Sequence, residues 1–223
     1  MEKYILSPDE SYNLYKLLYE VIKLFDQNNI QYWACGGTFL GAIRCKGIIK
    51  WDDDLDLCVL YKDKEKLKQI IEKDDRFFFD SKPSNLVDKI YYKTGKYPFV
   101  DIFFMVSEND GSQIVYKCAS SRAKDTWTNE YYLESEINPL KKVKFGGMEI
   151  NIPNQYKRYF LATYGENWNK EGVISYDHKK DEVLVKPIKW NLSERDYEAA
   201  FPFYFEESFE NRGKYFQNRW WQF

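Results

Sequence analysis

Four aspartates crowd into one short stretch of this 223-residue chain, Trp51-Asp52-Asp53-Asp54-Leu55-Asp56-Leu57. From position 54 onward, carboxylates alternate with apolar residues, and this period of two is typical of a β-strand with one buried face. Asp54 and Asp56 would then leave the same face of a sheet. Paired carboxylate oxygens form a hard-ligand site suited to Mg²⁺ or Mn²⁺. A solvated acidic turn is the alternative, because runs of aspartate are usually that.

A third aspartate interrupts a strongly β-prone stretch, Pro98-Phe99-Val100-Asp101-Ile102-Phe103-Phe104-Met105-Val106. A buried carboxylate is costly unless a cation or hydrogen-bond donors accompany it. A shared metal would supply that partner, so we expect Asp54, Asp56 and Asp101 to be both metal ligands and catalytic residues. Asp101 would complete the metal site or accept the proton of an attacking hydroxyl. Asp52 would be a further ligand or an outer group of the substrate site.

A glycine pair precedes the acidic run, in the order Cys35-Gly36-Gly37-Thr38-Phe39-Leu40-Gly41-Ala42-Ile43-Arg44. Between a short strand and a short helix, such a pair is typical of a helix start that binds phosphate, although glycine pairs also mark ordinary tight turns. Gly36, Gly37 and Thr38 would therefore bind the phosphates of a substrate. Arg44 would add a bidentate phosphate contact or pair with a nearby aspartate.

The composition excludes several classes of protein. A net charge of −2 argues against a general nucleic-acid binder, which is usually basic. His178 is the only histidine and the four cysteines form no C-x-x-C pair, which argues against a zinc site or a Ser-His-Asp triad. We interpret the cysteines as reduced, buried thiols.

The N-terminus has no signal-peptide pattern, and no stretch is long enough to span a bilayer. We therefore expect a cytoplasmic or otherwise soluble protein, compatible with contact at a membrane surface.

Helical and strand-like segments alternate along the chain. The start Ser7-Pro8-Asp9-Glu10 and the apolar spacing that follows predict an amphipathic helix ending near residue 28. The patterns predict further helices at about 38–44, 62–73 and 155–164, and strands at about 32–35, 55–60, 76–79, 87–93, 98–106 and 113–118. A second hairpin is expected around Gly146-Gly147.

These motifs resemble the LicD family of phosphotransferases, which includes bacterial phosphocholine transferases and fukutin-related proteins. The resemblance covers about residues 30–180 and its first block is specific. The matching segments are 36–44, 47–57, Val100-Asp101-Ile102-Phe103, Phe145-Gly146-Gly147, Ile152-Pro153 and Tyr164-Gly165-Glu166-Asn167-Trp168. Cys45 stands where many members have histidine, and Lys50 stands where most have proline.

The resemblance implies an α+β fold, with a nucleotidyltransferase-like mixed β-sheet flanked by helices. We expect a single domain over residues 1–223, in which the motif-bearing core spans about 30–180. An extension at about 181–223 would be mainly helical or irregular. By position, the resemblance makes Asp54 and Asp56 the metal ligands and Asp101 the third carboxylate.

The resemblance also implies a CDP-linked alcohol as donor and a sugar hydroxyl of a glycan as acceptor. The leading hypothesis is therefore a Mg²⁺-dependent phosphotransferase that moves a phosphocholine- or phosphoribitol-like group. One alternative is a nucleotidyltransferase that transfers NMP to a small-molecule or glycan acceptor. The other alternative is a non-catalytic module that binds a nucleotide or a glycan.

Overall fold

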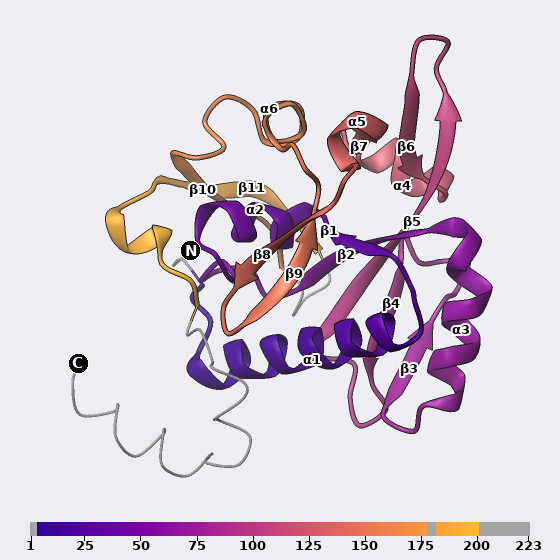
Figure 1. Ribbon diagram of the computed structural model, residues 1–223. Coiled ribbons are helices and arrows are strands. Elements are labelled where there is room, and N and C mark those ends of the chain that lie inside the picture. The colour runs from indigo at the N-terminus through magenta and orange to yellow at the C-terminus, as the bar shows by residue number, and fades with distance from the viewer. Residues whose placement is uncertain (1–3, 178–181, 201–223) are drawn as a thin grey trace.

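A mixed β-sheet with helices packed against it forms the centre of the protein (Figure 1). The computed structural model describes residues 4–177 and 182–200. His178 and the residues beyond Ala200, which include most of the expected C-terminal extension, lie outside the described residues.

The central sheet has seven strands, and its main path follows the order β1-β2-β5-β4-β3, while β6 pairs with β5 and β7 pairs with β6. Its strands are β1 (Tyr32–Ala34), β2 (Leu55–Leu60), β3 (Phe77–Asp80), β4 (Asp88–Tyr92), β5 (Phe99–Asn109), β6 (Ile114–Cys118) and β7 (Tyr131–Leu133). The pair β2–β5 is parallel and the other pairs are antiparallel. The sheet is therefore mixed, as the family resemblance implied.

The helices are α1 (Pro8–Gln27), α2 (Gly36–Arg44), α3 (Lys64–Lys73), α4 (Ser121–Thr126), α5 (Glu134–Ile137) and α6 (Lys157–Tyr164), with 3-10 turns at Tyr61–Asp63 and Glu194–Tyr197. Helices α1, α2, α3 and α6 lie close to their predicted positions, whereas the short helices α4 and α5 were not predicted. The start of α1 is a capping box, in which Ser7 accepts from the Glu10 N–H and Glu10 accepts from the Ser7 N–H. Its long apolar stripe is fully buried from Leu14 to Phe25.

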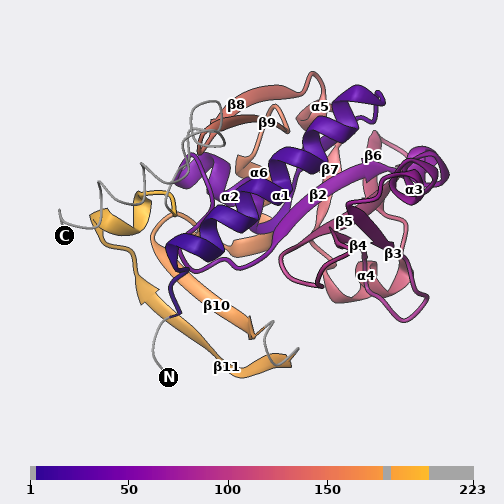
Figure 2. The same cartoon turned by 90° about the horizontal axis from the view of Figure 1, so that it is seen from below.

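Helices α1 and α3 cover one face of the sheet (Figures 1 and 2). Lys16 of α1 lies over the Tyr92 ring, and Lys64 of α3 lies over the Phe104 ring. Side chains alternate along a strand, so Phe104 and Asp101 leave opposite faces of β5. The carboxylates therefore lie on the face away from these two helices.

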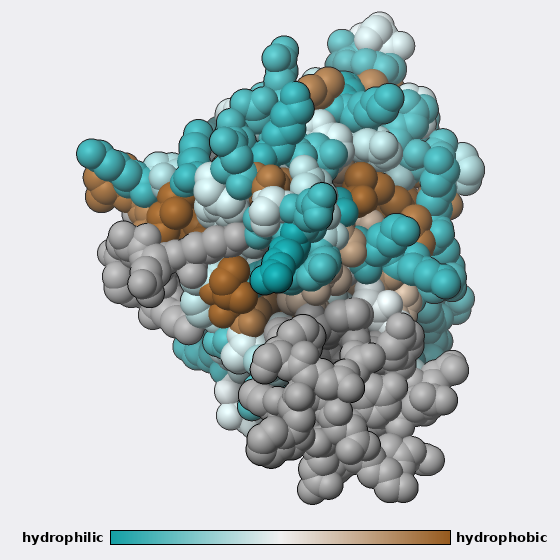
Figure 3. All heavy atoms as spheres, turned by 90° about the vertical axis from the view of Figure 1, so that its left-hand side faces the viewer, coloured by the Kyte–Doolittle hydropathy of each residue, from teal (hydrophilic) through white to brown (hydrophobic). Residues whose placement is uncertain are grey.

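Two small antiparallel sheets stand beside the central one. Strands β8 (Lys141–Phe145) and β9 (Met148–Ile152) form the hairpin expected around Gly146-Gly147, and β10 (Glu171–Asp177) pairs with β11 (Glu182–Asn191). Figure 3 faces the side of the molecule that lies on the left in Figure 1, and it shows brown apolar spheres between teal ones. Val185 of β11 is one of the exposed apolar residues.

The expectation of a mainly helical or irregular extension is wrong for its first described residues. Residues 182–191 form β11, and only the turn at Glu194–Tyr197 is helical. Pro187 lies within this strand, where proline is unusual because it cannot donate to a ladder. In the structure, the pairing shifts between Ile174 and Tyr176 of the partner strand, and such an irregularity tolerates a proline.

The mixed sheet and its flanking helices are confirmed, while the single domain over residues 1–223 stays a prediction. The four cysteines are free and buried. One apolar cluster includes residues from Leu6 to Ala200, and it holds the central sheet, α1 and the β8–β9 hairpin together. Across residues 4–177 and 182–200, the helices are too short or too polar to cross a lipid bilayer.

Candidate metal and phosphate site

Three carboxylates converge at the start of β2 and β5. Asp54, Asp56 and Asp101 each offer an oxygen, and these oxygens lie within 4.8 Å of one another. The parallel register sets Asp56 directly beside Asp101, and Asp54 precedes Asp56 by two residues on the same side. Asp56 and Asp101 are buried, while Asp54 is half-buried. The structure therefore brings together the three residues that the sequence pattern singled out.

The electrostatics of this cluster favour a cation. Burial raises the pKa of Asp56 well above its usual range, and the negative charges of Asp54, Asp52 and Asp101 raise it further. A divalent ion held by the three oxygens would offset both effects, because a nearby positive charge favours the ionised carboxylate. Hard oxygen donors in this number fit Mg²⁺ or Mn²⁺, whose remaining positions take water or phosphate oxygens. The donor set fits the expected metal, and the binding itself stays a prediction.

The glycine pair lets the N-terminus of α2 touch the carboxylates. Gly36 has φ +49°, in the left-handed region, and a Cβ at this position would lie 2.5 Å from Oδ2 of Asp56. The Gly37 N–H donates to the same oxygen over 2.9 Å, and a Cβ there would overlap Oδ2 of Asp52. The Gly36 N–H donates to the Tyr159 hydroxyl over 3.2 Å. Both N–H groups therefore have protein partners, and phosphate binding by Gly36 and Gly37 remains a prediction.

Thr38 anchors strand β2 to the same helix. Its buried hydroxyl accepts a hydrogen bond of 2.8 Å from the backbone N–H of Asp56. This contact fixes the depth of Asp56 relative to α2. Thr38 thus positions a carboxylate in the structure, whereas the sequence prediction gave it a phosphate contact that stays untested.

Replacing Thr38 with valine is expected to lower the free energy of unfolding by about 1–3 kcal/mol, because the buried Asp56 N–H would lose its acceptor. Thr38→Ser keeps the hydroxyl and should lose less. Urea unfolding of both variants measures the difference. No loss in Thr38→Val would mean that the hydroxyl does not stabilise this contact.

Arg44 ends α2 and points back toward the loop after α6. Its Nη2 donates to the backbone carbonyl of Trp168. Burial lowers the pKa of the Arg44 guanidinium. Negative charges nearby, including that of Asp52, oppose this decrease in pKa. Nε of Arg44 is buried and has no hydrogen-bond acceptor among the described residues. Among the described residues, the hydrogen-bond partner of Arg44 is the Trp168 carbonyl and not an aspartate, so its role in phosphate binding stays a prediction.

Two charged residues of this region were not predicted from the sequence as part of the site. Lys89 of β4 forms an ion pair with Asp101 over 2.6 Å. Lys89 is one of three charged residues in the strand predicted at 87–93, so its charge alone did not single it out. Glu130 lies before β7 and joins the same face of the sheet, and no local pattern in the sequence indicates this position.

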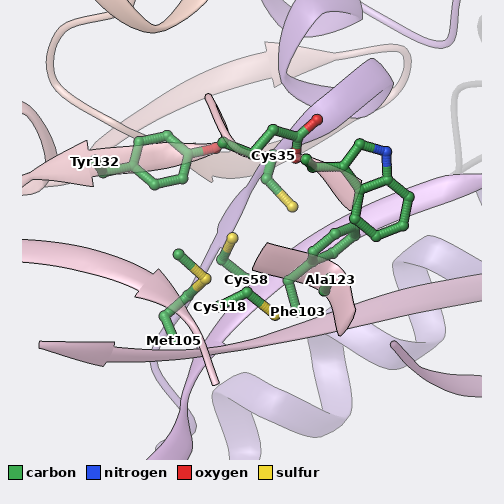
Figure 4. A pocket seen from close by; sticks show the side chains of 9 residues that line it. Cys35, Cys58, Phe103, Met105, Cys118, Ala123 and Tyr132 are labelled. Atoms are coloured by element: carbon green, nitrogen blue, oxygen red, sulfur yellow. The ribbon is translucent and has the colours of Figure 1, made fainter. Parts of the chain in front are cut away.

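A small cavity continues the carboxylate face along the strands (Figure 4). The register pairs Cys58 with Phe103. This pair lies two residues beyond the Asp56–Asp101 pair on the same face, a distance of roughly 7 Å along the strands. The cavity measures about 10 Å³, which holds one water. Its lining residues are Cys35, Cys58, Phe103, Met105, Cys118, Ala123, Trp127, Glu130 and Tyr132.

Glu130 is the ionisable carboxyl group of this cavity. Burial raises its pKa to about 7, and a hydrogen bond with Tyr159 partly opposes the change. Tyr159 also accepts from the Gly36 N–H. A chain of polar contacts thus connects Glu130 to the start of α2.

Glu130→Gln is expected to stabilise the protein at pH 8 but not at pH 4. The folded pKa lies above the unfolded value, so the folded state loses stability as the pH rises from about 4.3 to 7. The loss amounts to about 4 kcal/mol above that window. Thermal unfolding at pH 4, 6 and 8 measures it, with Glu149→Gln on the exposed side of β9 as the control. A gain that does not change with pH would contradict this account.

A mixed sheet that places an acidic triad beside a glycine-started helix defines a nucleotidyltransferase fold. The chain belongs to the family of LicD/FKTN/FKRP nucleotidyltransferase domains, whose family model matches residues 29–155. The motif resemblance in the sequence is therefore confirmed.

Relatives with curated sequences come from bacteria and mammals. An uncharacterized protein of Rickettsia typhi is 33% identical over 208 residues, which cover 91% of this chain and 63% of that protein. One of Rickettsia prowazekii is 31% identical over 178 residues, which cover 80% of this chain and 63% of that protein. The chain thus spans under two thirds of the length of both. The human protein named ribitol 5-phosphate transferase FKRP is 24% identical over 156 residues, covering 65% of this chain and 30% of FKRP.

Among solved structures, the lincosamide antibiotic adenylyltransferase LnuA with bound lincomycin matches with a TM-score of 0.44 and 15% identity. The match covers 71% of this chain and 86% of LnuA.

Proposed function

We propose that this protein is a metal-dependent transferase that moves a phospho-alcohol from a CDP-linked donor to a hydroxyl of a glycan. The observation that carries the proposal is the convergence of Asp54, Asp56 and Asp101 within 4.8 Å. Membership of the LicD/FKTN/FKRP family and the likeness to a ribitol 5-phosphate transferase support the phospho-alcohol. The donor nucleotide and the acceptor come from the family resemblance.

Each residue of the candidate site would have its own role in this reaction. Asp54, Asp56 and Asp101 would hold Mg²⁺ or Mn²⁺, which when bound neutralises charge on the donor phosphates. The start of α2 at Gly36, Gly37 and Thr38 would favour the same phosphates through its dipole. Nε of Arg44, which has no acceptor among the described residues, would gain one in a phosphate oxygen. Asp52 would lie beside these groups as a further ligand or an outer charge.

The proposed reaction is a substitution at phosphorus. The acceptor hydroxyl oxygen would form a bond to the phosphorus that carries the alcohol. The bond from this phosphorus to the bridging oxygen would break, and CMP would leave with its electron pair. The hydroxyl proton would pass to Asp101 when that carboxylate is not fully engaged by metal, or to water.

The rival enzymatic function is transfer of NMP to the acceptor. The same metal site serves both reactions, because the choice depends on which phosphorus faces the acceptor. Release of CMP from a CDP-alcohol supports the proposal, whereas release of pyrophosphate from a nucleoside triphosphate supports the rival. A non-catalytic module would bind its nucleotide equally well with and without a divalent cation.

Thermal unfolding with a panel of CDP-alcohols, nucleotide sugars and nucleoside triphosphates tests the proposal. A ligand that binds the folded state raises its stability by linkage. We expect a CDP-alcohol to raise the melting temperature only when Mg²⁺ or Mn²⁺ is present. A shift by nucleoside triphosphates alone, or one that ignores the metal, would contradict the proposal.

A further inference from the structure

Lys89 stands in the same row of the sheet as the carboxylates. The antiparallel pair β4–β5 sets Lys89 beside Asp101, and the parallel pair β2–β5 sets Asp56 on the other side of Asp101. Paired residues of neighbouring strands share a face. Three adjacent strands therefore carry Asp56, Asp101 and Lys89 side by side on the face away from α1.

Two contacts fix the position of the Lys89 ammonium. Nζ lies 2.6 Å from Oδ1 of Asp101 and 3.7 Å from the centroid of the Phe99 ring. Phe99 precedes Asp101 by two residues and so leaves the same face of β5. A lysine ammonium has three donors, and the bond to Asp101 uses one of them. The side chain remains 32% exposed, so part of it is accessible to solvent.

A contribution to the stability of the fold is a weak explanation for the position of Lys89 beside Asp101. The ion pair has one partly exposed member, so solvent screens it and weakens its contribution to stability. A lysine on Asp101 would also repel a divalent ion bound to the same carboxylate, and so weaken metal binding. An anionic group that contacts both cations would offset this repulsion. The phosphates of the proposed donor supply such a group.

Other basic side chains near the acidic run have different partners. Nζ of Lys50 pairs with Glu198 over 2.9 Å and donates to the carbonyl of Arg195. Arg44 donates to the carbonyl of Trp168. Lys89 thus differs from both in that its head group contacts one of the three carboxylates directly.

We propose that Lys89 is a substrate-binding residue whose ammonium contacts the phosphates of the donor beside the metal. This inference rests on the proposed function and adds a residue to it. Lys89 would keep its contact with Asp101 and direct its remaining donors to phosphate oxygens. It would neutralise charge on the donor from the β4 side, opposite the start of α2.

The test compares Lys89→Met with Lys89→Arg and with Lys93→Met as a matched control. Lys93 follows β4 and donates to the carbonyl of Asp74, away from the carboxylates. Calorimetry and thermal unfolding measure the affinity for two probes, Mg²⁺ alone and CDP in the presence of Mg²⁺. We expect Lys89→Met to weaken CDP binding by about tenfold or more, as for the loss of a charge-assisted hydrogen bond. Mg²⁺ alone should bind at least as tightly, Lys89→Arg should retain part of the CDP affinity, and Lys93→Met should match the parent protein.

Several results would overturn the inference. CDP affinity of Lys89→Met within about twofold of the parent would remove Lys89 from the donor site. A parallel loss of Mg²⁺ affinity would show that the lysine serves only to position Asp101. If the parent protein binds no CDP even with Mg²⁺, both this inference and the proposed function would be overturned. The two proposals therefore fail in distinguishable ways.

Discussion

Replacement of Asp56 with asparagine is expected to abolish transfer while leaving the metal-free protein as stable as before or more so. Asp56 lies beside Asp101 across the strand pair and follows Asp54 by two residues, so it belongs with both to the candidate metal site. Loss of one charged ligand should lower turnover by at least about 1,000-fold, equivalent to about 4 kcal/mol of activation free energy. CMP release from the donor that the binding screen identifies measures this loss.

The stability of the same variant follows from the raised pKa of Asp56. Burial and the neighbouring carboxylates disfavour the ionised form in the folded state. The folded state therefore loses stability as the pH rises above the unfolded pKa of about 3.9, and asparagine removes this loss. Thermal unfolding in EDTA should show a larger gain at pH 8 than at pH 4. Because the amide can still accept from the Gly37 N–H, the local fold should persist.

Asp53→Asn is the matched control for this prediction. Asp53 belongs to the same acidic run but lies outside the triad of converging oxygens. It should keep most of the activity. Full turnover by Asp56→Asn would show that the chemistry does not need this carboxylate. Global unfolding of the variant would show that Asp56 serves the structure.

Replacement of Gly36 with alanine is expected to lower activity by about 100-fold or more without removing any polar group, because displacements near 1 Å cost this much in a reacting site. The new Cβ would lie 2.5 Å from Oδ2 of Asp56 and would push the carboxylate out of the triad. The residue also holds φ +49°, where a side chain costs about 1–2 kcal/mol. Transfer assays and urea unfolding separate the two effects.

Gly111→Ala provides the control for backbone strain. Gly111 has φ +95° in the turn between β5 and β6, and a Cβ there would meet no atom within 4 Å. It should lose stability through its backbone conformation but keep its activity. Equal activity losses in both variants would show that strain, and not displacement of Asp56, disables the protein.

Elements defined by local signals were predicted well from the sequence. The capping box at Ser7 and the apolar stripe of α1 act within one helix, so they are visible in consecutive residues. The alternation that ends at Leu57 marks β2, and the run that contains Asp101 marks β5, because side chains of a strand alternate between its faces. The motifs around these strands were also enough to indicate the family, which the family model confirms.

Contacts between distant segments were not predictable in the same way. Lys89 meets Asp101 only because β4 pairs with β5 in one particular register. Glu130 joins the carboxylate face because β7 is carried there by β6, and the partner of Arg44 is a carbonyl 124 residues away. Strand β11 was missed because its sequence shows weak periodicity, and only its pairing with β10 defines it.

The residue types and their spacing thus determined that acidic side chains would share one face of a strand, since the alternation of a β-strand depends on no other part of the chain. Tertiary structure decided which strand lies next to which, and so which charges meet. The parallel register of β2 and β5 brought Asp101 to Asp54 and Asp56, and the left-handed Gly36 brought α2 against them. Strand pairing and helix packing are set by the burial of the whole apolar core, which no short stretch of sequence contains.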